Sequence, residues 1–179
     1  MAFLTSPDLI SLFEKEYGKK KLVLDTNLLI LLMVGFFDST YIPQCRITER
    51  FTEQDYQLLL SICQHFESEI IITPHIMAEL SNLSRSKRGI SDDRLRMYFN
   101  VAVDKLNQYK EEHIPFGEIA AIDLGIIVNF GFTDMTIVEA AKKLGAVILT
   151  DDLPLAEHAV SCGMVAINFT NIKTYNFAQ

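Results

Sequence analysis

Four short, mainly apolar runs separated by segments with helical signals constrain the fold of this chain most strongly. They are Leu-Val-Leu at 22–24, Glu-Ile-Ile-Ile at 69–72, Ala-Val-Ile-Leu at 146–149 and Val-Ala-Ile at 165–167. Strands that are apolar at successive positions are typical of a parallel sheet that is covered on both faces. Parallel neighbours also need crossover connections, which are usually helices. We therefore predict an α/β fold, a three-layer sandwich with a mainly parallel central sheet of about four to five strands.

The connecting segments carry the signals of helix starts and helix ends. Thr-Glu-Gln-Asp at 52–55 resembles a capping box, and apolar residues then recur with the period of an amphipathic helix. Gly131 is typical of a turn and Gly145 of a helix end. We predict helices at about 7–17 and 28–37, after 52 and after 73, at 91–109, in a segment ending near 129, at 133–144 and at 154–162, with a loop at 38–51.

Length and composition predict a single soluble domain. With 179 residues the chain is expected to form one domain, 1–179, with its core at about 20–170. Residues 1–18 are assigned to an N-terminal helix and about 38–68 to a loop-plus-helix elaboration. The longest apolar run, 28–37, is shorter than the roughly 20 residues that span a bilayer, and no secretory signal is apparent. The three cysteines form no CxxC pair, so we expect a cytoplasmic protein without a membrane partner.

The charge balance disfavours one class of nucleic-acid-binding protein. The chain has 16 Lys and Arg against 23 Asp and Glu, which gives a net charge of −7. A protein that coats nucleic acid without regard to sequence is expected to be basic. An enzyme with a metal site is not excluded, because its carboxylates count as negative until the cation binds.

Acidic residues follow the first and third predicted strands and lie in two of the predicted helices. Asp25 comes directly after the first strand, and Asp151 and Asp152 come just after the third. Glu79 follows the second strand by about two helical turns, and Asp134 begins the helix that leads into the third strand. The carboxyl ends of parallel strands lie at one edge of the sheet, where ligands bind. We therefore expect four separate elements to bring carboxylates together at this edge.

Such a cluster predicts a divalent cation. Two like charges about 5 Å apart repel by roughly 3 kcal/mol at an effective dielectric constant near 20, so the carboxylates need a cation or protons. Oxygen ligands suit Mg²⁺, with Mn²⁺ as a close substitute. Such an ion polarises a phosphoryl oxygen and activates water for in-line attack. The predicted reaction is phosphodiester hydrolysis.

Four motifs occur in order along the chain. They are Leu-Asp-Thr-Asn-Leu-Leu at 24–29, Thr-Pro-His-Ile-Met-Ala-Glu-Leu at 73–80, Phe-Thr-Asp-Met-Thr-Ile-Val-Glu-Ala-Ala at 132–141 and Ile-Leu-Thr-Asp-Asp at 148–152. Together they span about 130 of the 179 residues. In this order and in this strand or helix context, they resemble the motifs of PIN-domain (PilT N-terminus-like) nucleases. The resemblance implies a single PIN-like domain.

By position, the resemblance implies a metal-dependent ribonuclease with four acidic site residues. These are Asp25, Glu79, Asp134 and Asp152, which would bind Mg²⁺ or Mn²⁺. The third strand of the family usually ends in Thr-x-Asp, which selects Asp152 and leaves Asp151 as a further candidate ligand or a helix cap. Asn27 would form hydrogen bonds in the site, or serve as a turn residue. Each acid also has a structural interpretation, as a helix cap or a solvated helix residue.

Many members of the family cleave single-stranded RNA, some as toxins of toxin-antitoxin pairs, and many are dimers. The resemblance thus implies a single-stranded RNA substrate, an antitoxin-like protein as candidate partner, and a homo-oligomer. The segment 85–96 has a net charge of +3 and follows the helix that carries Glu79. Arg85, Lys87 and Arg88 are therefore candidates for contacts with substrate phosphates. The alternative is a solvated loop.

Two other functions compete with the nuclease. Asp25 could form an aspartyl-phosphate, as in phosphotransfer domains, but the haloacid-dehalogenase pattern has a second Asp two residues further on, where this chain has Asn27. The other alternative is a non-catalytic PIN-like binding module. The presence of all four carboxylates favours the nuclease.

Overall fold

Five parallel strands form the central sheet, in the order β3-β2-β1-β4-β5. The computed structural model describes residues 20–177. The order of the strands reverses beside β1, which lies between β2 and β4. The prediction of an α/β three-layer sandwich with a mainly parallel sheet is confirmed. The strands are β1 (Leu22–Leu24), β2 (Ile70–Ile72), β3 (Lys110–Glu111), β4 (Val147–Thr150) and β5 (Val165–Asn168).

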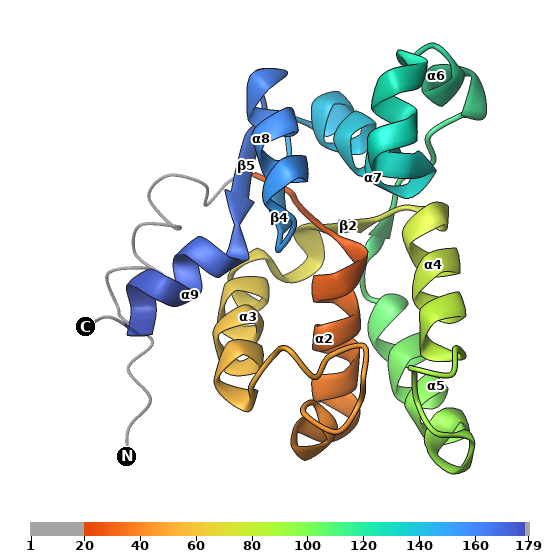
Figure 1. Cartoon of the computed structure of the whole chain (residues 1–179), viewed down its shortest axis with the longest axis vertical. Helices are drawn as coiled ribbons and strands as arrows, with labels where there is room; N and C mark the ends of the chain where they lie inside the picture. Colours follow the sequence, from red (N-terminus) through yellow and green to blue (C-terminus); the bar gives the residue numbers. More distant parts are fainter. Residues whose placement is uncertain (1–19, 178–179) are drawn as a thin grey trace.

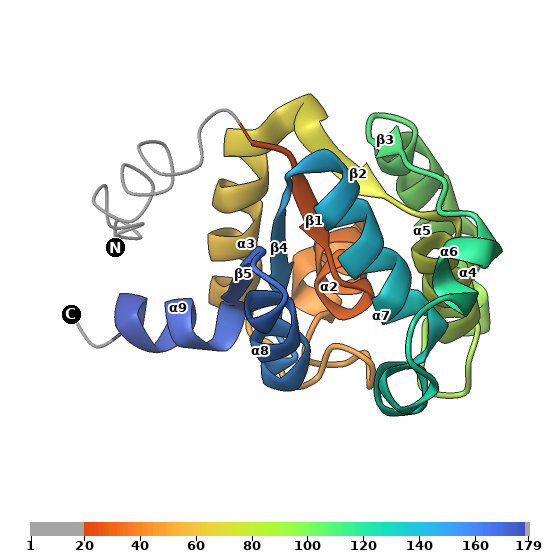
Figure 2. The same cartoon turned by 90° about the horizontal axis from the view of Figure 1, so that it is seen from above.

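Helices cover both faces of this sheet. In Figure 1, α2, α3 and α5 lie below the sheet and α7 and α8 above it, and Figure 2 shows α7 and α8 in front of the strands. The helix α4 packs against both α2 and α7. The elements are α2 (Thr26–Asp38), η1 (Ser39–Tyr41), α3 (Glu53–Phe66), η2 (Glu67–Glu69), α4 (Pro74–Ser84), α5 (Asp92–Leu106), α6 (Phe116–Ala120), α7 (Leu124–Leu144), α8 (Leu153–Ser161) and α9 (Phe169–Phe177), where η marks a short 3₁₀ helix.

Most predicted elements lie where their local signals place them. The four predicted strands correspond to β1, β2, β4 and β5 within one residue at each end. The capping box at the start of α3 forms, because the amide of Thr52 donates to Asp55 (2.8 Å) and the amide of Asp55 donates to Thr52 Oγ1 (3.1 Å). The helix predicted at 28–37 begins two residues earlier, since Asp25 caps it. Residues 38–51, predicted as a loop, contain η1 and a series of turns.

The strand β3, the short helices α6 and α9, and the 3₁₀ helices η1 and η2 were not predicted as separate elements, and one predicted helix lies outside the described residues. The strand β3 has two polar, exposed residues and pairs with β2, so its strand conformation depends on its neighbour. The short α9 follows β5 directly. The predicted helix at about 7–17 precedes the part of the chain that the structure describes.

The helix α7 replaces two predicted helices. The turn expected at Gly131 is a kink inside it, where the backbone has φ 83° and ψ 176°. The helix ends at Gly145, whose left-handed φ of 61° fits the predicted helix end. By length and composition alone, α7 is the one helix in the described residues that could cross a membrane. It is kinked, and its second half, including Met135 and Ile137, is buried in the core.

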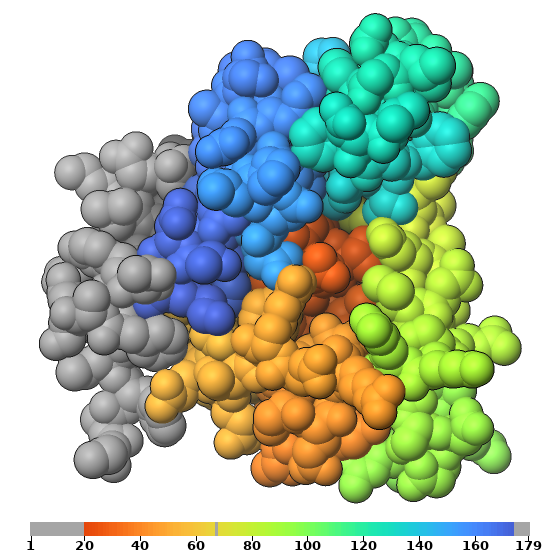
Figure 3. All heavy atoms as spheres, in the orientation of Figure 1, coloured from red at the N-terminus to blue at the C-terminus, as the bar shows by residue number. Residues whose placement is uncertain are grey.

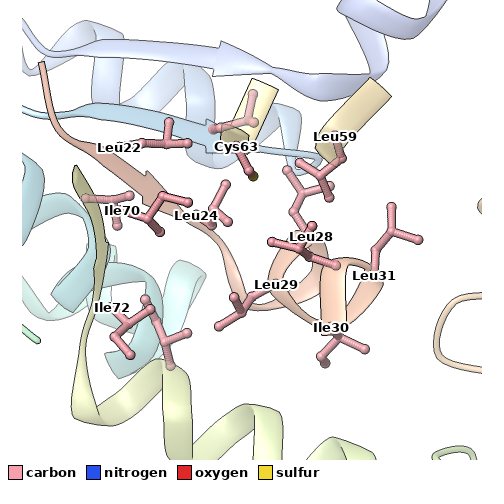
Figure 4. Close-up of a cluster of buried hydrophobic side chains, with 14 of the residues drawn as sticks. Leu22, Leu24, Leu28, Leu29, Ile30, Leu31, Leu59, Cys63, Ile70 and Ile72 are labelled. Atoms are coloured by element: carbon pink, nitrogen blue, oxygen red, sulfur yellow. The ribbon is translucent and has the colours of Figure 1, made fainter. Parts of the chain in front are cut away.

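The main core lies between the sheet and the first helix. Each described residue from Leu28 to Val34 is buried, so α2 is apolar on all sides and lies between the sheet, α3 and α5. Figure 4 shows Leu24 of β1 in one buried cluster with Leu28 of α2 and Leu59 of α3. This packing holds the end of β1 and the start of α2 in place.

A glycine in α2 provides a test of this packing. A Cβ atom at Gly35 would lie 2.2 Å from two ring carbons of Tyr56, in α3. Ala is favoured over Gly in a helix by about 1 kcal/mol, but such a clash costs about 1–3 kcal/mol or more. We therefore expect Gly35→Ala to lower the free energy of unfolding, measured by denaturant titration. Gly117→Ala, whose Cβ meets nothing within 4 Å, is the control, and an equal response of both variants would contradict the prediction.

Candidate active site

Asp25 joins the ends of two neighbouring strands. Leu24 pairs in register with Leu149, so Asp25 lies level with Thr150 at the carboxyl edge of the sheet. Its Oδ2 accepts from the Thr150 hydroxyl and from the Asp151 amide (2.9 Å), and its Oδ1 accepts from the Leu28 amide (2.7 Å). Asp25 is thus also a helix cap, and only 3% of it is exposed. Burial, with the nearby charge of Asp151, raises its pKa to about 8.

Asp151 is the carboxylate that lies against Asp25. Its side chain is 6% exposed, and its Oδ2 forms an ion pair with Arg50. Its Oδ1 is buried and has no hydrogen-bond partner. A buried carboxylate oxygen without a partner is costly, because it has lost its hydration without replacement. The partly exposed Arg50 therefore balances the charge of Asp151, whereas Asp25 is held by neutral hydrogen-bond donors.

A second group of acids lies on the adjacent helices. The hydroxyl of Thr26, the residue after Asp25, donates to Glu79 Oε2 (2.8 Å), which ties α4 to the start of α2. Asp134 is half-buried at the kinked part of α7. Burial and the nearby charges of Glu79 and Asp152 raise the pKa of Asp134 to about 7. All four acids predicted from the sequence thus contribute to one edge of the molecule.

Asp152 and Asn27 are the most exposed of the predicted site residues. Asp152 Oδ1 accepts from the Leu155 amide (3.0 Å) and so caps α8, while the Asp152 amide donates to Thr150 Oγ1 (2.9 Å). The Thr150 hydroxyl therefore donates to the carboxylate of Asp25 and accepts from the backbone amide of Asp152. Asn27 lies in the first turn of α2 and lines a pocket of about 300 Å³ beside the acids. The charge of Asp151 acts on Asp25, whereas the charges of Glu79 and Asp152 act on Asp134.

The donor chemistry of this edge fits a hard divalent cation. Within residues 20–177, no three His, Cys, Asp or Glu side chains are already arranged to hold a metal ion. The available donors are carboxylate and hydroxyl oxygens, which Mg²⁺ and Mn²⁺ prefer. The unpartnered Oδ1 of Asp151, beside the buried Asp25, is the oxygen most in need of a cation.

Three of the contacts were not predicted from the sequence. Thr26 and Thr150 lie inside the quoted motifs, and their hydroxyls orient Glu79 and Asp25. Their positions beside the motif acids could therefore have indicated these two contacts. Arg50 comes from the loop between α2 and α3, and nothing near it in the sequence indicates a contact with Asp151. The predicted basic residues Arg85 and Lys87 lie after α4, in the wall of a pocket of about 490 Å³. Arg88 lines this pocket and also the one beside Asn27.

Comparisons with known proteins give one similar structure and no family. No model of a protein family matches the chain, and no curated protein sequence does. One solved structure, a domain of a functionally unknown protein from Methanocaldococcus jannaschii DSM 2661, is similar with 16% sequence identity and a TM-score of 0.43. The match covers 83% of this chain and 90% of that one. The resemblance to PIN-domain nucleases therefore stays a prediction from the sequence motifs.

Proposed function

We propose that the chain is a Mg²⁺- or Mn²⁺-dependent endonuclease that hydrolyses phosphodiester bonds of single-stranded RNA. The observation that carries the proposal is the buried pair of Asp25 and Asp151 at the edge where the strand order reverses. Burial and the charge of Asp151 disfavour the ionised form of Asp25, and one Asp151 oxygen has no partner, so a divalent cation would stabilise the pair. The carboxylates of Glu79, Asp134 and Asp152 come from separate elements, and Glu79 is tied to Thr26, the residue after Asp25.

The residues of the chain have distinct roles in this proposal. Bound Mg²⁺ or Mn²⁺ would polarise a phosphoryl oxygen and lower the pKa of water. Three hydrogen bonds hold Asp25 in one orientation, which positions it as a ligand. The Thr26 hydroxyl holds Glu79 by one oxygen and leaves the other to orient the attacking water. Asp134, whose pKa is raised by burial and by the charges of Glu79 and Asp152, is the candidate to take the proton of that water.

The products follow from the direction of attack that the family resemblance implies. Water adds to phosphorus as the bond to the 3′ oxygen breaks, and the 3′ oxygen gains a proton. Cleavage leaves a 5′-phosphate and a 3′-hydroxyl.

The proposal extends to the cellular setting that the resemblance implies. The chain would act in the cytoplasm, as the toxin of a toxin-antitoxin pair, blocked by an antitoxin-like protein. Exposed apolar side chains on α6 and α7, among them Phe116, Leu124 and Val128, are available for contacts with a second copy.

The burial of Asp25 favours hydrolysis over phosphotransfer. A carboxylate that becomes phosphorylated must reach the phosphorus atom with a free oxygen. Both oxygens of Asp25 accept hydrogen bonds, and the residue is 3% exposed. The geometry suits a fixed ligand better than a nucleophile.

A cleavage assay tests the function. End-labelled single-stranded RNA and DNA of the same sequence are incubated with the purified protein and Mn²⁺, Mg²⁺ or EDTA. We expect internal cuts in the RNA with either cation, none with EDTA, and products that a 5′-phosphate-dependent exonuclease degrades. Cleavage that persists in EDTA would contradict the metal dependence. Absence of cleavage on a broad RNA panel, with the protein folded, would favour the binding-module alternative.

A further inference from the structure

A groove with an excess of positive charge lies beside the acidic edge, and the proposed reaction does not use it. Two pockets, of about 300 and 490 Å³, are adjacent and share Arg46, Ser86 and Arg88 in their walls. Figure 3 shows the start of α2, in red, at the bottom of a hollow bordered by the loop after α2, by α4 and by α8. We call the two adjacent pockets the basic groove and define it by Arg46, Arg50, Arg85, Lys87 and Arg88.

The basic groove contrasts in charge with the whole chain, whose net charge is −7. Its five cations face two carboxylates in the walls, Glu49 and Asp92, so three positive charges are in excess. Among the described residues, only one of the five cations, Arg50, forms an ion pair. The other four are exposed, and their charges are available to a ligand.

Two neighbouring arginines of the predicted basic segment do not belong to the groove. Arg94 turns toward α2, where it pairs with Asp38 (3.2 Å) and lies over the ring of Tyr41. Arg96 lies beyond one end of the groove, in a third pocket whose walls also include Arg85 and Phe99. The loop between α2 and α3 instead supplies Arg46 and Arg50. The elaboration at 38–68 thus acquires a role in building the groove.

One end of the basic groove meets the acidic edge. Asn27, two residues after Asp25, lines the smaller pocket together with Arg50. Arg50 in turn forms the ion pair with Asp151, the neighbour of Asp25. A chain of phosphates lying in the groove would therefore pass directly to the buried carboxylates.

We propose that the basic groove binds the sugar-phosphate backbone of a single-stranded nucleic acid on one side of the phosphate that is cut. The inference rests on the proposed nuclease function and specifies where the substrate strand binds beside the acidic site. Guanidinium groups bind phosphate oxygens with two parallel hydrogen bonds, and such contacts position a strand without reading its sequence. The aromatic ring in the groove wall, Tyr41, is 9% exposed, so it offers no platform on which a base can stack. The groove should accept strands with little sequence preference.

Binding without cleavage tests this inference. The full chain is titrated in EDTA against a fluorescent 15-nucleotide RNA of mixed sequence, by anisotropy, at several salt concentrations. Each phosphate contact in a single strand contributes about 0.7 to the slope of log K against log salt. We expect the double variant Arg46→Gln/Arg88→Gln to lower that slope by about 1.4 and to weaken binding at least about tenfold at low salt.

Matched controls separate the groove from total charge. Lys87→Gln, in the groove, and Lys142→Gln, on α7, remove the same charge from exposed positions. Lys142 lies near the end of the helix that leads into the start of β4, at the opposite edge of the sheet, and pairs with Glu139 (3.4 Å). We expect weaker binding for the first variant alone. Circular dichroism melts confirm that each variant is folded.

The outcomes distinguish this inference from the nuclease proposal. Wild-type affinity in the folded double variant would overturn the inference, even if the protein cuts RNA. Equal losses for Lys87→Gln and Lys142→Gln would overturn it as well, because total charge would then govern binding. Groove-dependent binding by a protein that never cuts would support the groove and reject the nuclease. Displacement of the RNA by poly-glutamate at equal charge would reveal a general polyanion surface and also count against the inference.

Discussion

Replacement of Asp25 by Asn is expected to lower the rate of RNA cleavage by at least about 100-fold, because a lost cation forfeits several kcal/mol of transition-state stabilisation. The amide keeps the shape of the carboxyl group and still caps α2, since Asn and Asp are equally good in that position. It cannot supply the negative charge that a divalent cation requires. Single-turnover cleavage with saturating Mn²⁺ measures the loss.

The same variant is expected to fold as well as the wild type or better. In the absence of a cation, the wild-type protein must bury the Asp25 carboxyl beside Asp151. The Asn side chain removes that repulsion, so the melting temperature at pH 8 should be equal or higher. Asp123→Asn is the matched control, because Asp123 also caps a helix, through the Gly125 amide (2.8 Å), but is exposed. A variant at Asp25 that cleaves at the wild-type rate would refute the assignment of the site.

The second large effect concerns stability against pH. Without divalent cations, the folded protein is expected to lose stability as the pH rises from about 4 to about 8. The pKa of Asp25 is raised on folding from 3.8 to about 8, and that of Asp134 from 3.8 to about 7. The folded state therefore holds protons that the unfolded state has released, and this contribution disappears as the pH passes the folded pKa values. The pKa of Asp38 is lowered on folding, so its contribution to stability grows with rising pH, but only at pH values below this range.

Thermal melts in EDTA at pH 5, 6, 7 and 8 measure this loss, which we expect to be on the order of 10 °C in melting temperature. Mn²⁺ should restore stability more at pH 8 than at pH 5, because the cation competes with protons for the same oxygens. In the Asp25→Asn variant the pH dependence should be smaller. A melting temperature that rises steadily from pH 5 to pH 8 in EDTA would show that the acids are not buried together as described.

Local signals account for most of the elements. The strands β1, β2 and β4 have buried residues at every position, and such continuous apolar runs have few alternatives in a chain of this length. Helix starts were predictable where a side chain caps the backbone, as Thr73 does for α4. The strand β3 could not be predicted, because Lys110 and Glu111 have no strand preference of their own. They pair only because β2 lies beside them.

The sequence alone placed Asp25, Glu79, Asp134 and Asp152 at one edge, because residues that follow parallel strands, or lie on the helices between them, share that edge. Only the tertiary structure decided which acids are neighbours. It put Asp151 against Asp25 and brought Arg50 to it from a loop about 100 residues away in sequence. It also joined that loop to the basic residues after α4. Periodicity and motifs report local conformation, whereas ion pairs and grooves depend on how loops of irregular structure pack, which no local signal encodes.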